Sequence, residues 1–243
     1  MQRYFADSKI TTEYQLTPEI YKHAIKVLRM KVGDTFELVD DAEVVHKMEI
    51  TKIEDGKAEA TSVEVIPSDV ELPSNVTIAC GISKNDKADW IVQKGTEMGA
   101  TKFIFFVGDY SVAKWDKKRS SKKVQRLQKI ARSAAEQSHR TKIPEVTFVE
   151  KLKDIDFKKN DARIVAYEES AKKGESGNLF KILNKKPSGI IAIFGPEGGI
   201  SPKEIEFLEA NGFILAGLGP RIMRAETAPL YFLASLSFAL ELS

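Results

Sequence analysis

Short apolar runs alternate with stretches of helical periodicity from residue 76 onward. The runs predict strands over 76–82, 103–107, 163–167, 189–194 and 213–218. The periodic stretches predict helices near 86–98, 120–138, 178–184, 202–211 and 229–242. Since strands that alternate with helices usually pair in parallel, the pattern favours an α/β domain over residues 76–243.

Residues 1–70 follow a different pattern, which predicts a small β-rich unit with a single helix. Thr17 at the N-cap and Pro18 at the first helical position begin this helix, and Gly33 ends it. The alternation of apolar and polar residues suits the strands of a small barrel, which we expect over 35–39, 44–50 and 57–65. Residues 71–75 lack periodicity and contain a proline, so we expect them to link the two domains.

One pattern occurs twice in the last third of the chain, an apolar run that ends in a Gly-Pro loop. The run 189–194 leads into GPEGGI (195–200), and the run 213–218 leads into GPRIMRAETAP (219–229). Between them Ser201, Pro202 and Glu204 form a capping box that begins a helix. The βαβ order places both loops at carboxyl ends of parallel strands, where open α/β sheets bind ligands.

The second loop favours a functional site over an ordinary turn. GPEGG alone is compatible with a simple turn, and neither loop has the dinucleotide fingerprint or the phosphate-loop sequence. However, Arg221, Arg224 and Glu226 lie within six residues of one another, directly before the apolar stretch 230–242. Charges at that point fill no core, so we regard these three residues as candidates for chemistry.

The composition indicates a soluble globular protein. The chain has 243 residues, of which 42% are hydrophobic and 30% charged, and no apolar run has the length of a membrane span. The N-terminal residues lack the apolar core of a signal peptide, so we expect a cytoplasmic protein. The single cysteine, Cys80, lies in an apolar run and is expected to be a buried core residue. Three scattered histidines predict no metal site.

Basic residues are concentrated in one segment, although the net charge is only +2. Nine basic residues and one acid lie between Lys114 and Arg132. On the predicted helix 120–138, Lys122, Arg126 and Lys129 share the face opposite the apolar positions. This asymmetry is expected of a surface that contacts phosphates, although many basic helix faces are merely solvated. The polar segment 168–177 is expected to be a mobile loop.

These motifs are similar to those of the RsmE family, bacterial 16S ribosomal RNA (uracil-N3) methyltransferases of the SPOUT superfamily. The resemblance rests on FGPEGG followed by SPKEIEF, and on LGPRIMRAETAP before an apolar C-terminal helix. It extends over nearly the whole chain through short segments at 3–5, His23 with 27–29, 94–99, and 136–138 with Arg140 and Pro144. The two loops in this order and spacing are highly specific.

The resemblance implies a fold and a set of ligands. It implies a SPOUT-type α/β domain with a C-terminal trefoil knot, a preceding PUA-like β-barrel that binds RNA, and a homodimer formed through the C-terminal helix. It implies S-adenosylmethionine as the methyl donor and 16S rRNA of the small ribosomal subunit as the partner. The donor-binding positions would be Tyr167, Glu168, Phe194, Gly195, Glu197, Gly198, Gly199, Leu218, Gly219, Ile222, Met223 and Arg224.

The implied RNA contacts come from both parts of the chain. They are Arg3, Arg29 and Lys31 on the barrel, Lys122, Arg126 and Lys129 on the basic helix, and Arg140. Arg29 has an alternative interpretation as a surface ion pair at a helix end. His139, with its neighbours Gln137 and Arg140, is a candidate for contacts on the substrate side or with a partner subunit.

The implied reaction constrains the candidate catalytic residues. Uracil N3 carries an imide proton, which must leave before N3 can attack a methyl carbon. Arg221 and Arg224 would stabilise the anionic oxygen that develops on the ring. Glu226 would accept the proton, or would instead pair with an arginine and cap the last helix.

Two other functions remain open at this point. One is a SPOUT methyltransferase that acts on another RNA position or on a ribose 2′-OH. The other is a non-catalytic RNA-binding assembly factor, which would bind no methyl donor.

Overall fold

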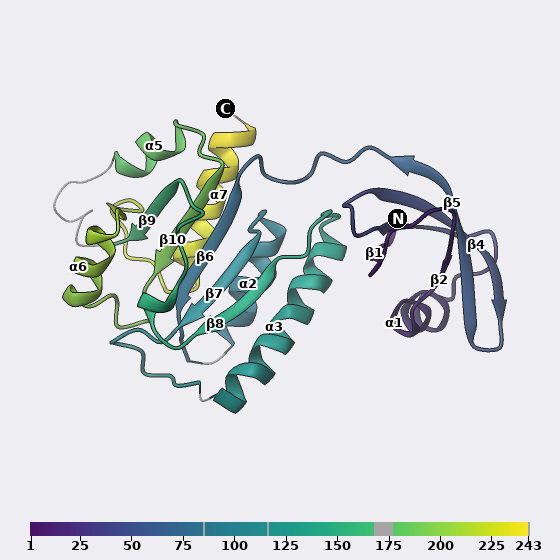
Figure 1. The fold of residues 1–243 in the computed structure, drawn as a ribbon, viewed down its shortest axis with the longest axis horizontal. Coiled ribbons are helices and arrows are strands. Elements are labelled where there is room, and N and C mark those ends of the chain that lie inside the picture. The colour runs from purple at the N-terminus through teal and green to yellow at the C-terminus, as the bar shows by residue number, and fades with distance from the viewer. Residues whose placement is uncertain (85, 116, 168–176, 243) are drawn as a thin grey trace. The chain divides into compact units, whose positions relative to one another are not determined.

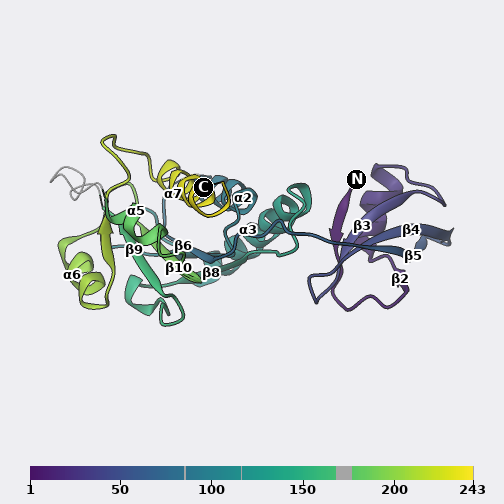
Figure 2. The ribbon, with the colours of Figure 1, turned by 90° about the horizontal axis from the view of Figure 1, so that it is seen from above.

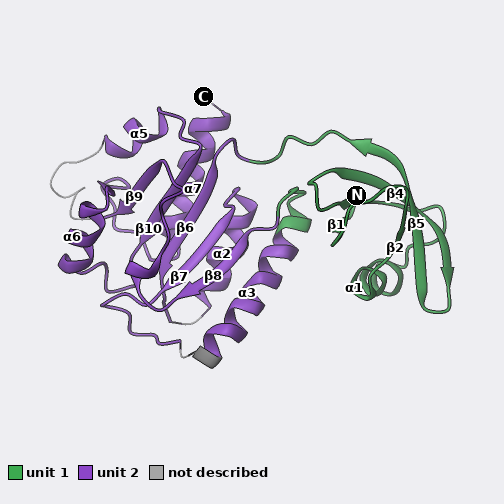
Figure 3. Ribbon diagram, viewed as in Figure 1, with its two compact units in different colours: residues 1–71, 135–142 green, residues 72–134, 143–243 purple. Residues whose placement is uncertain are grey.

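The computed structural model describes residues 1–84, 86–115, 117–167 and 177–242, and it divides into two compact units (Figure 3). Unit 1 contains residues 1–71 and 135–142, and unit 2 contains residues 72–134 and 143–243. Segment 135–142 therefore groups with the N-terminal unit, although it follows a long stretch of unit 2 in the sequence. The division into domains at 70 and 76 that the sequence suggests stays a prediction.

Unit 1 is built on a five-stranded sheet in the order β1-β3-β4-β5-β2. The strands are β1 (Arg3–Phe5), β2 (Glu13–Gln15), β3 (Thr35–Val39), β4 (Val45–Glu54) and β5 (Lys57–Ile66). The pairing of β1 with β3 is parallel and the other pairings are antiparallel. Side chains such as Phe36, Leu38 and Met48 are fully buried and form the core of this unit. The three predicted strands are confirmed, whereas the two short strands β1 and β2 were not predicted.

The helix of unit 1 starts as predicted but ends earlier. Thr17 caps α1 (Pro18–Tyr21), and its hydroxyl accepts a hydrogen bond from the Ile20 backbone N–H at 3.3 Å. The chain continues as the π-helical segment η1 (Lys22–Val27), and Arg29 then adopts a left-handed conformation with φ 58°. The prediction that the helix extends to Gly33 was therefore wrong, because the turn is made by Arg29, a residue type that rarely marks a helix end.

Unit 2 is built on a six-stranded sheet whose pairings are all parallel, in the order β11-β9-β10-β6-β7-β8 (Figure 1). The strands are β6 (Asn75–Gly81), β7 (Lys102–Phe106), β8 (Glu145–Val149), β9 (Ala162–Ala166), β10 (Gly189–Phe194) and β11 (Ile214–Ala216). The sequence predicted five of these strands, and it missed β8. Strand β11 is also shorter than the predicted 213–218.

Helices cover both faces of this sheet. They are α2 (Lys87–Glu97), α3 (Lys117–Gln137), α5 (Asn178–Leu183), α6 (Pro202–Ala210) and α7 (Thr227–Glu241), with a short 3₁₀ turn, η2 (Leu152–Asp154). Figure 2 shows α2 and α7 on one side of the sheet, where Ile91 and Phe232 pack against strand residues such as Phe105. Leu208 of α6 packs on the other face with Ile193. The predicted α/β architecture is confirmed.

The capping box that begins α6 is confirmed in full. The Ser201 hydroxyl accepts from the Glu204 backbone N–H at 3.2 Å, and the Glu204 carboxylate accepts from the Ser201 N–H at 2.9 Å. Ser201 is buried, and its hydroxyl also donates to Asp109 at 2.5 Å. The cap therefore fixes both the start of α6 and the loop that follows β7.

Replacing Ser201 by alanine should lower the free energy of unfolding by about 0.5–2 kcal/mol, the usual cost of losing an N-cap. Urea unfolding measures this difference. Lys203→Ala, at an exposed position in the same helical turn, is the matched control and should have less than half of that effect. Equal effects of the two substitutions would contradict a specific role of the cap.

Candidate functional site

A cavity of about 580 Å³ opens at the carboxyl end of the sheet of unit 2. It lies where β9, β10 and β11 end, at the edge that the double-loop pattern predicts for a ligand. Its lining residues come from the ends of these strands, from the loops that follow β10 and β11, and from the first residues of α2 and α7. They are Lys87, Ala166, Tyr167, Phe194–Ile200, Leu218, Gly219, Arg221–Ala225 and Ala228.

The first loop, after β10, turns sharply because glycine occupies two critical positions. The Gly199 backbone N–H donates to the Pro196 carbonyl at 2.9 Å, and Gly199 has φ +80°, a conformation that favours glycine. A Cβ on Gly195 would lie only 2.8 Å from the Gly199 carbonyl carbon. The loop therefore folds back on itself and turns its backbone toward the cavity.

The second loop, after β11, carries positive charge. Arg221 and Arg224 are exposed, and neither forms an ion pair with a residue of the described ranges. Gly219 has φ +100°, and no atom lies within 4 Å of the position that its Cβ would occupy. The loop thus offers two guanidinium groups that no acid of the described ranges pairs with.

Lys87 connects the two loops through its ion pairs, and the sequence did not indicate it as a residue of the site. Its Nζ lies 2.9 Å from Glu197 Oε1 in the first loop and 3.3 Å from Glu226 Oε2, just before α7. The second contact has the distance of an ion pair but not the alignment of a hydrogen bond, so Glu226 Oε2 is buried without a hydrogen-bond partner among the described residues. The one feature of the sequence that could have indicated Lys87 is its place after β6, because β6 pairs with β10 and the two strands end at the same edge of the sheet.

The alternative role considered for Glu226 is corrected in two respects. Its carboxylate pairs with Lys87 instead of an arginine. Glu226 does occupy the N-cap position of α7, but its side chain makes no capping hydrogen bond there. Glu226 is therefore held by the ammonium group of Lys87, the first residue of α2, which itself lines the cavity.

The ion pairs change the acid–base behaviour of Lys87 and Glu197. The pKa of Lys87 is raised, chiefly by its hydrogen bond to Glu197, although partial burial acts in the opposite direction. Burial would raise the pKa of Glu197, but the hydrogen bonds from Lys87 and from backbone N–H groups outweigh it and lower that pKa. Both groups therefore keep their charges at neutral pH.

The structure brings together most of the predicted donor-binding positions. Tyr167, Phe194, Gly195, Glu197, Gly198, Gly199, Leu218, Gly219, Ile222, Met223 and Arg224 all line the cavity. Tyr167 is anchored by its backbone N–H, which donates to the Ala216 carbonyl at 3.1 Å. Glu168 and most of the loop predicted over 168–177 lie outside the described residues.

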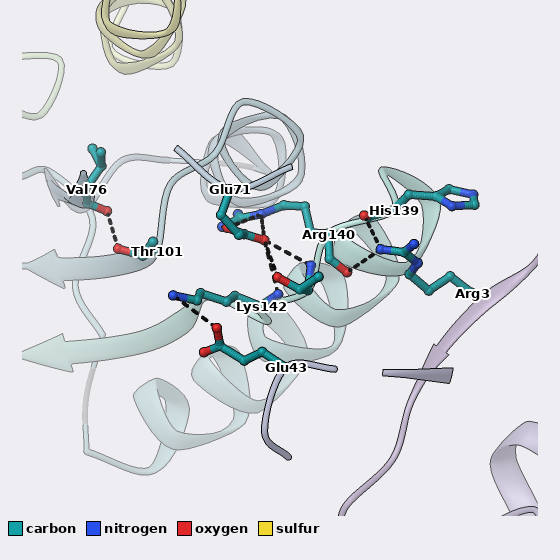
Figure 4. A network of polar contacts seen from close by, with 9 residues as sticks. Arg3, Glu43, Glu71, Val76, Thr101, His139, Arg140 and Lys142 are labelled. Carbon is teal, nitrogen blue, oxygen red and sulfur yellow. Dashed lines mark hydrogen bonds and ion pairs between the residues drawn. The ribbon is translucent and has the colours of Figure 1, made fainter. Parts of the chain in front are cut away.

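Two of the predicted RNA contacts, Arg3 and Arg140, are corrected. Both side chains are buried, with 4% and 2% of each residue exposed (Figure 4). Arg3 donates to Glu37 at 2.8 Å and to the His139 carbonyl, and Arg140 donates to Glu71 at 3.2 Å. These guanidinium groups hold segment 135–142 within unit 1 and offer no charge to a phosphate. His139 itself pairs with Glu37 at 3.0 Å.

The remaining predicted RNA contacts are exposed. Lys122 and Lys129 of α3 form no ion pair with any residue that the structure describes. Arg126 is also exposed, but it makes a two-pronged pair with Asp89 of α2, with one N–O distance of 2.7 Å. Arg29 and Lys31 are exposed in unit 1. Of the three predicted contacts on α3, Lys122 and Lys129 therefore have no ion-pair partner among the described residues, whereas Arg126 has one.

Other expectations from composition can also be compared with the structure. Cys80 is buried, and burial raises the pKa of its thiol, so the residue belongs to the core as predicted. Within the described residues, no group of His, Cys, Asp and Glu is arranged to hold a metal ion. Nor does any described helix have the length and apolar character needed to cross a membrane.

Comparison with known proteins gives consistent matches along the chain. Residues 70–237 match the family model of an RNA methyltransferase domain, and residues 16–61 match that of an RNA methyltransferase PUA domain. Ribosomal RNA small subunit methyltransferase E of Bacillus subtilis (strain 168) is 40% identical over 254 aligned positions, which cover 100% of this chain and 98% of that protein.

Solved structures are similar over almost the full length. A crystal structure of a hypothetical protein has a TM-score of 0.92 and 37% identity, covering 99% of both chains. Ribosomal RNA small subunit methyltransferase E from Neisseria gonorrhoeae, bound to S-adenosyl methionine, has a TM-score of 0.85 and 29% identity, covering 98% of this chain and 97% of that one.

The ion pair of Glu197 predicts a pH-dependent stability difference. A carboxyl group whose pKa is lowered on folding stabilises the folded state above its ordinary pKa of 4.5, and this contribution is lost as the pH falls through the lowered value. Urea unfolding should therefore show Glu197→Gln to be less stable than wild type at pH 7, with the difference shrinking below pH 4.5. Glu206→Gln, at an exposed position of α6, serves as the control. A difference that stayed constant with pH would exclude the ion pair as its cause.

Proposed function

The chain belongs to the ribosomal RNA small subunit methyltransferase E family of RNA methyltransferases, and from this premise we propose that it methylates N3 of one specific uridine in 16S rRNA, with S-adenosylmethionine as donor. The PUA-domain match, 16–61, falls in unit 1, and the methyltransferase match, 70–237, falls in unit 2 except for residues 70–71 and 135–142. The observation that carries the proposal is the cavity at the carboxyl end of the sheet, where two glycine-containing loops meet and the second contributes two arginines that have no ion-pair partner among the described residues.

The cavity suits S-adenosylmethionine in size and chemistry. Its volume of about 580 Å³ is in the range of small-molecule sites. Open space beside Gly199 and Gly219 lets backbone groups approach a ligand, and Tyr167, Phe194 and Met223 supply apolar and aromatic surface. When bound, the donor supplies a methyl carbon activated by a positively charged sulfur. We include Glu168 among the residues that hold it.

The acceptor side requires groups that stabilise negative charge. As N3 loses its imide proton, charge develops on the ring oxygens of the uracil, and fixed cations beside the donor stabilise that charge. Arg224 and Arg221 can direct their charge toward a substrate because neither is neutralised by a described acid. We therefore assign the charge-stabilising role to Arg224, with Arg221 as its neighbour.

Glu226 is the proton acceptor in this proposal. Its Oε2 has no hydrogen-bond donor among the described residues, and Lys87 holds the carboxylate beside the cavity. The proton on N3 would pass to this carboxylate, and the electron pair that it leaves on N3 would form the bond to the methyl carbon. The bond from that carbon to the donor's sulfur would break at the same time, and S-adenosylhomocysteine would leave with the electron pair on its neutral sulfur.

The RNA must present an unpaired uridine, because N3 lies on the Watson–Crick edge of the base. We propose that Arg29 and Lys31 of the PUA-like domain, and Lys122 and Lys129 of α3, contact the phosphate backbone around it. Such contacts position an RNA without reading its sequence.

We also propose that the protein is a homodimer formed through α7, with the C-terminal trefoil knot that its family resemblance implies. Helix α7 buries Phe232, Leu233 and Leu236, yet it leaves Phe238 64% exposed and Tyr231 39% exposed. Apolar side chains of this size on one helix support an interface with a second copy. Sedimentation equilibrium giving only the mass of a single chain at all concentrations would rule the dimer out.

Mass mapping tests the reaction itself. Purified protein and S-adenosylmethionine are incubated with small ribosomal subunits from cells that lack the modification, and the rRNA is then digested and analysed. We expect one uridine to gain a methyl group on its base. A methyl group on ribose, or on another nucleotide, would show that the target is not N3 of a uridine. If the protein binds no donor in calorimetry, it is a non-catalytic factor.

Replacing Arg224 by alanine should reduce the single-turnover rate of methylation by roughly 100-fold, a typical cost of removing one group that stabilises transition-state charge. RNA affinity should change less than about twofold, since a single contact beside the reacting base contributes little to binding of the whole rRNA. Lys185→Ala is the control, because Lys185 is exposed and precedes β10, at the opposite edge of the sheet. Loss of rate and affinity in equal proportion would show that Arg224 is only a binding residue.

Changing Lys122 and Lys129 together to glutamine should flatten the dependence of RNA affinity on salt. Each lost phosphate contact lowers the slope of log K against log salt by about 0.7–0.9, so the double variant should lose about 1.4–1.8. Arg126→Gln is a matched control on the same helix face, and it should change the slope less because Arg126 is committed to Asp89. A slope identical to wild type in the double variant would mean that α3 is only solvated surface.

A further inference from the structure

The loop after β7 carries Tyr110, an exposed aromatic side chain that belongs to none of the contacts described so far. Tyr110 is 48% exposed, and its ring makes no ring contact, hydrogen bond or ion pair with any described residue. Tyrosine is enriched at binding interfaces, so an exposed tyrosine ring beside a cavity is a candidate for contact with a ligand.

The backbone that carries Tyr110 is fixed on both sides. The Asp109 N–H donates to Glu204 Oε1 at 3.1 Å, and the Asp109 carboxylate accepts from the Ser201 hydroxyl. A tight turn follows, in which the Ser111 N–H donates to the Gly108 carbonyl at 2.9 Å and the Gly108 N–H donates to the Ser111 hydroxyl at 3.0 Å. The ring is thus displayed by a preorganised turn.

Tyr110 lies directly against the wall of the cavity. A Cβ on Gly198, which lines the cavity, would lie 2.8 Å from Tyr110 Cβ and 3.0 Å from its carbonyl oxygen. The absence of a side chain at Gly198 therefore allows the loop after β7 to contact the first loop. Because the contact involves the Cβ and backbone of Tyr110, the aromatic ring is not needed to support the first loop.

The same segment leads from the cavity to the basic helix. Val112, two residues after Tyr110, is 64% exposed, and Trp115 then anchors the chain by packing against Phe105 and Phe148 at ring distances of 5.6 and 5.5 Å. Helix α3 follows, with its exposed Lys122 and Lys129. Tyr110 therefore lies in the segment of the chain that connects β7 to the basic helix.

We propose that the ring of Tyr110 stacks on an unpaired RNA base at the rim of the methyl-transfer cavity, as a substrate-positioning residue. This inference rests on the proposed function. A base taken out of its helical stack loses its stacking partners, and an aromatic side chain of the protein replaces them. Stacking accepts any base, so Tyr110 would position the strand while other groups select the uridine.

The experiment compares Tyr110→Ala, Tyr110→Phe and Val112→Ala with wild type. Unmodified small ribosomal subunits are methylated in single-turnover reactions at subsaturating and saturating enzyme, and donor affinity is measured by calorimetry with S-adenosylmethionine. Tyr110→Ala should lower the second-order rate by about 5- to 150-fold, as expected for one lost base stack. Tyr110→Phe keeps the ring and should restore at least half of the wild-type rate. Val112→Ala should change the rate less than twofold.

Donor affinity distinguishes stacking from a structural role. All variants should bind S-adenosylmethionine as wild type does, because the atoms of Tyr110 that contact Gly198 remain in the alanine variant. A loss of donor affinity that matches the loss of rate would overturn the proposal and make Tyr110 a support of the first loop. A change in sedimentation of Tyr110→Ala would overturn it in favour of a contact between subunits.

The outcome also separates this inference from the proposed function. If wild type methylates the subunits and Tyr110→Ala does so equally fast, only the stacking role is wrong. If wild type binds no donor and transfers no methyl group, the proposed function fails, and the role of Tyr110 fails with it.

Discussion

The site depends on one constraint, the parallel pairing of β10 between β6 and β9. Strand β10 pairs with β6 over its whole length, from Gly189 to Phe194, and with β9 over four positions. All six of its residues are buried, so its register is fixed by packing on both faces. Three carboxyl ends are thereby set side by side, which brings together Lys87, Tyr167 and the first loop although they are far apart in the sequence.

Local rules predicted much of this arrangement. Periodicity identified five strands of unit 2 and, among its described residues, the α-helices α2, α3, α5, α6 and α7, and the capping box at Ser201 predicted the start of α6. The two loops were recognised because their spacing after apolar runs places them at one edge of a parallel sheet. These features depend on neighbours in the sequence, so the sequence alone contains the necessary information.

Pairings between distant residues were not predictable in the same way. Arg3 and Arg140 look like surface charges in a sequence, but each finds an acidic partner, Glu37 or Glu71, and both are buried. Arg126 is similarly committed to Asp89. Lys87 was missed for the converse reason, since a lysine at the start of a helix carries no motif. In each case the function of a charge depends on which opposite charge the fold places beside it.

The grouping of residues 135–142 with the N-terminal unit has a consequence for synthesis of the chain. When residue 71 has been made, Arg3 still lacks its acceptor at His139, and Glu71 still lacks Arg140. Unit 1 cannot complete its buried polar contacts until the whole of segment 72–134 has also emerged. Folding on the ribosome therefore cannot finish one unit before the next begins. The N-terminal sheet must wait, with Arg3 paired only to Glu37, for a segment translated much later.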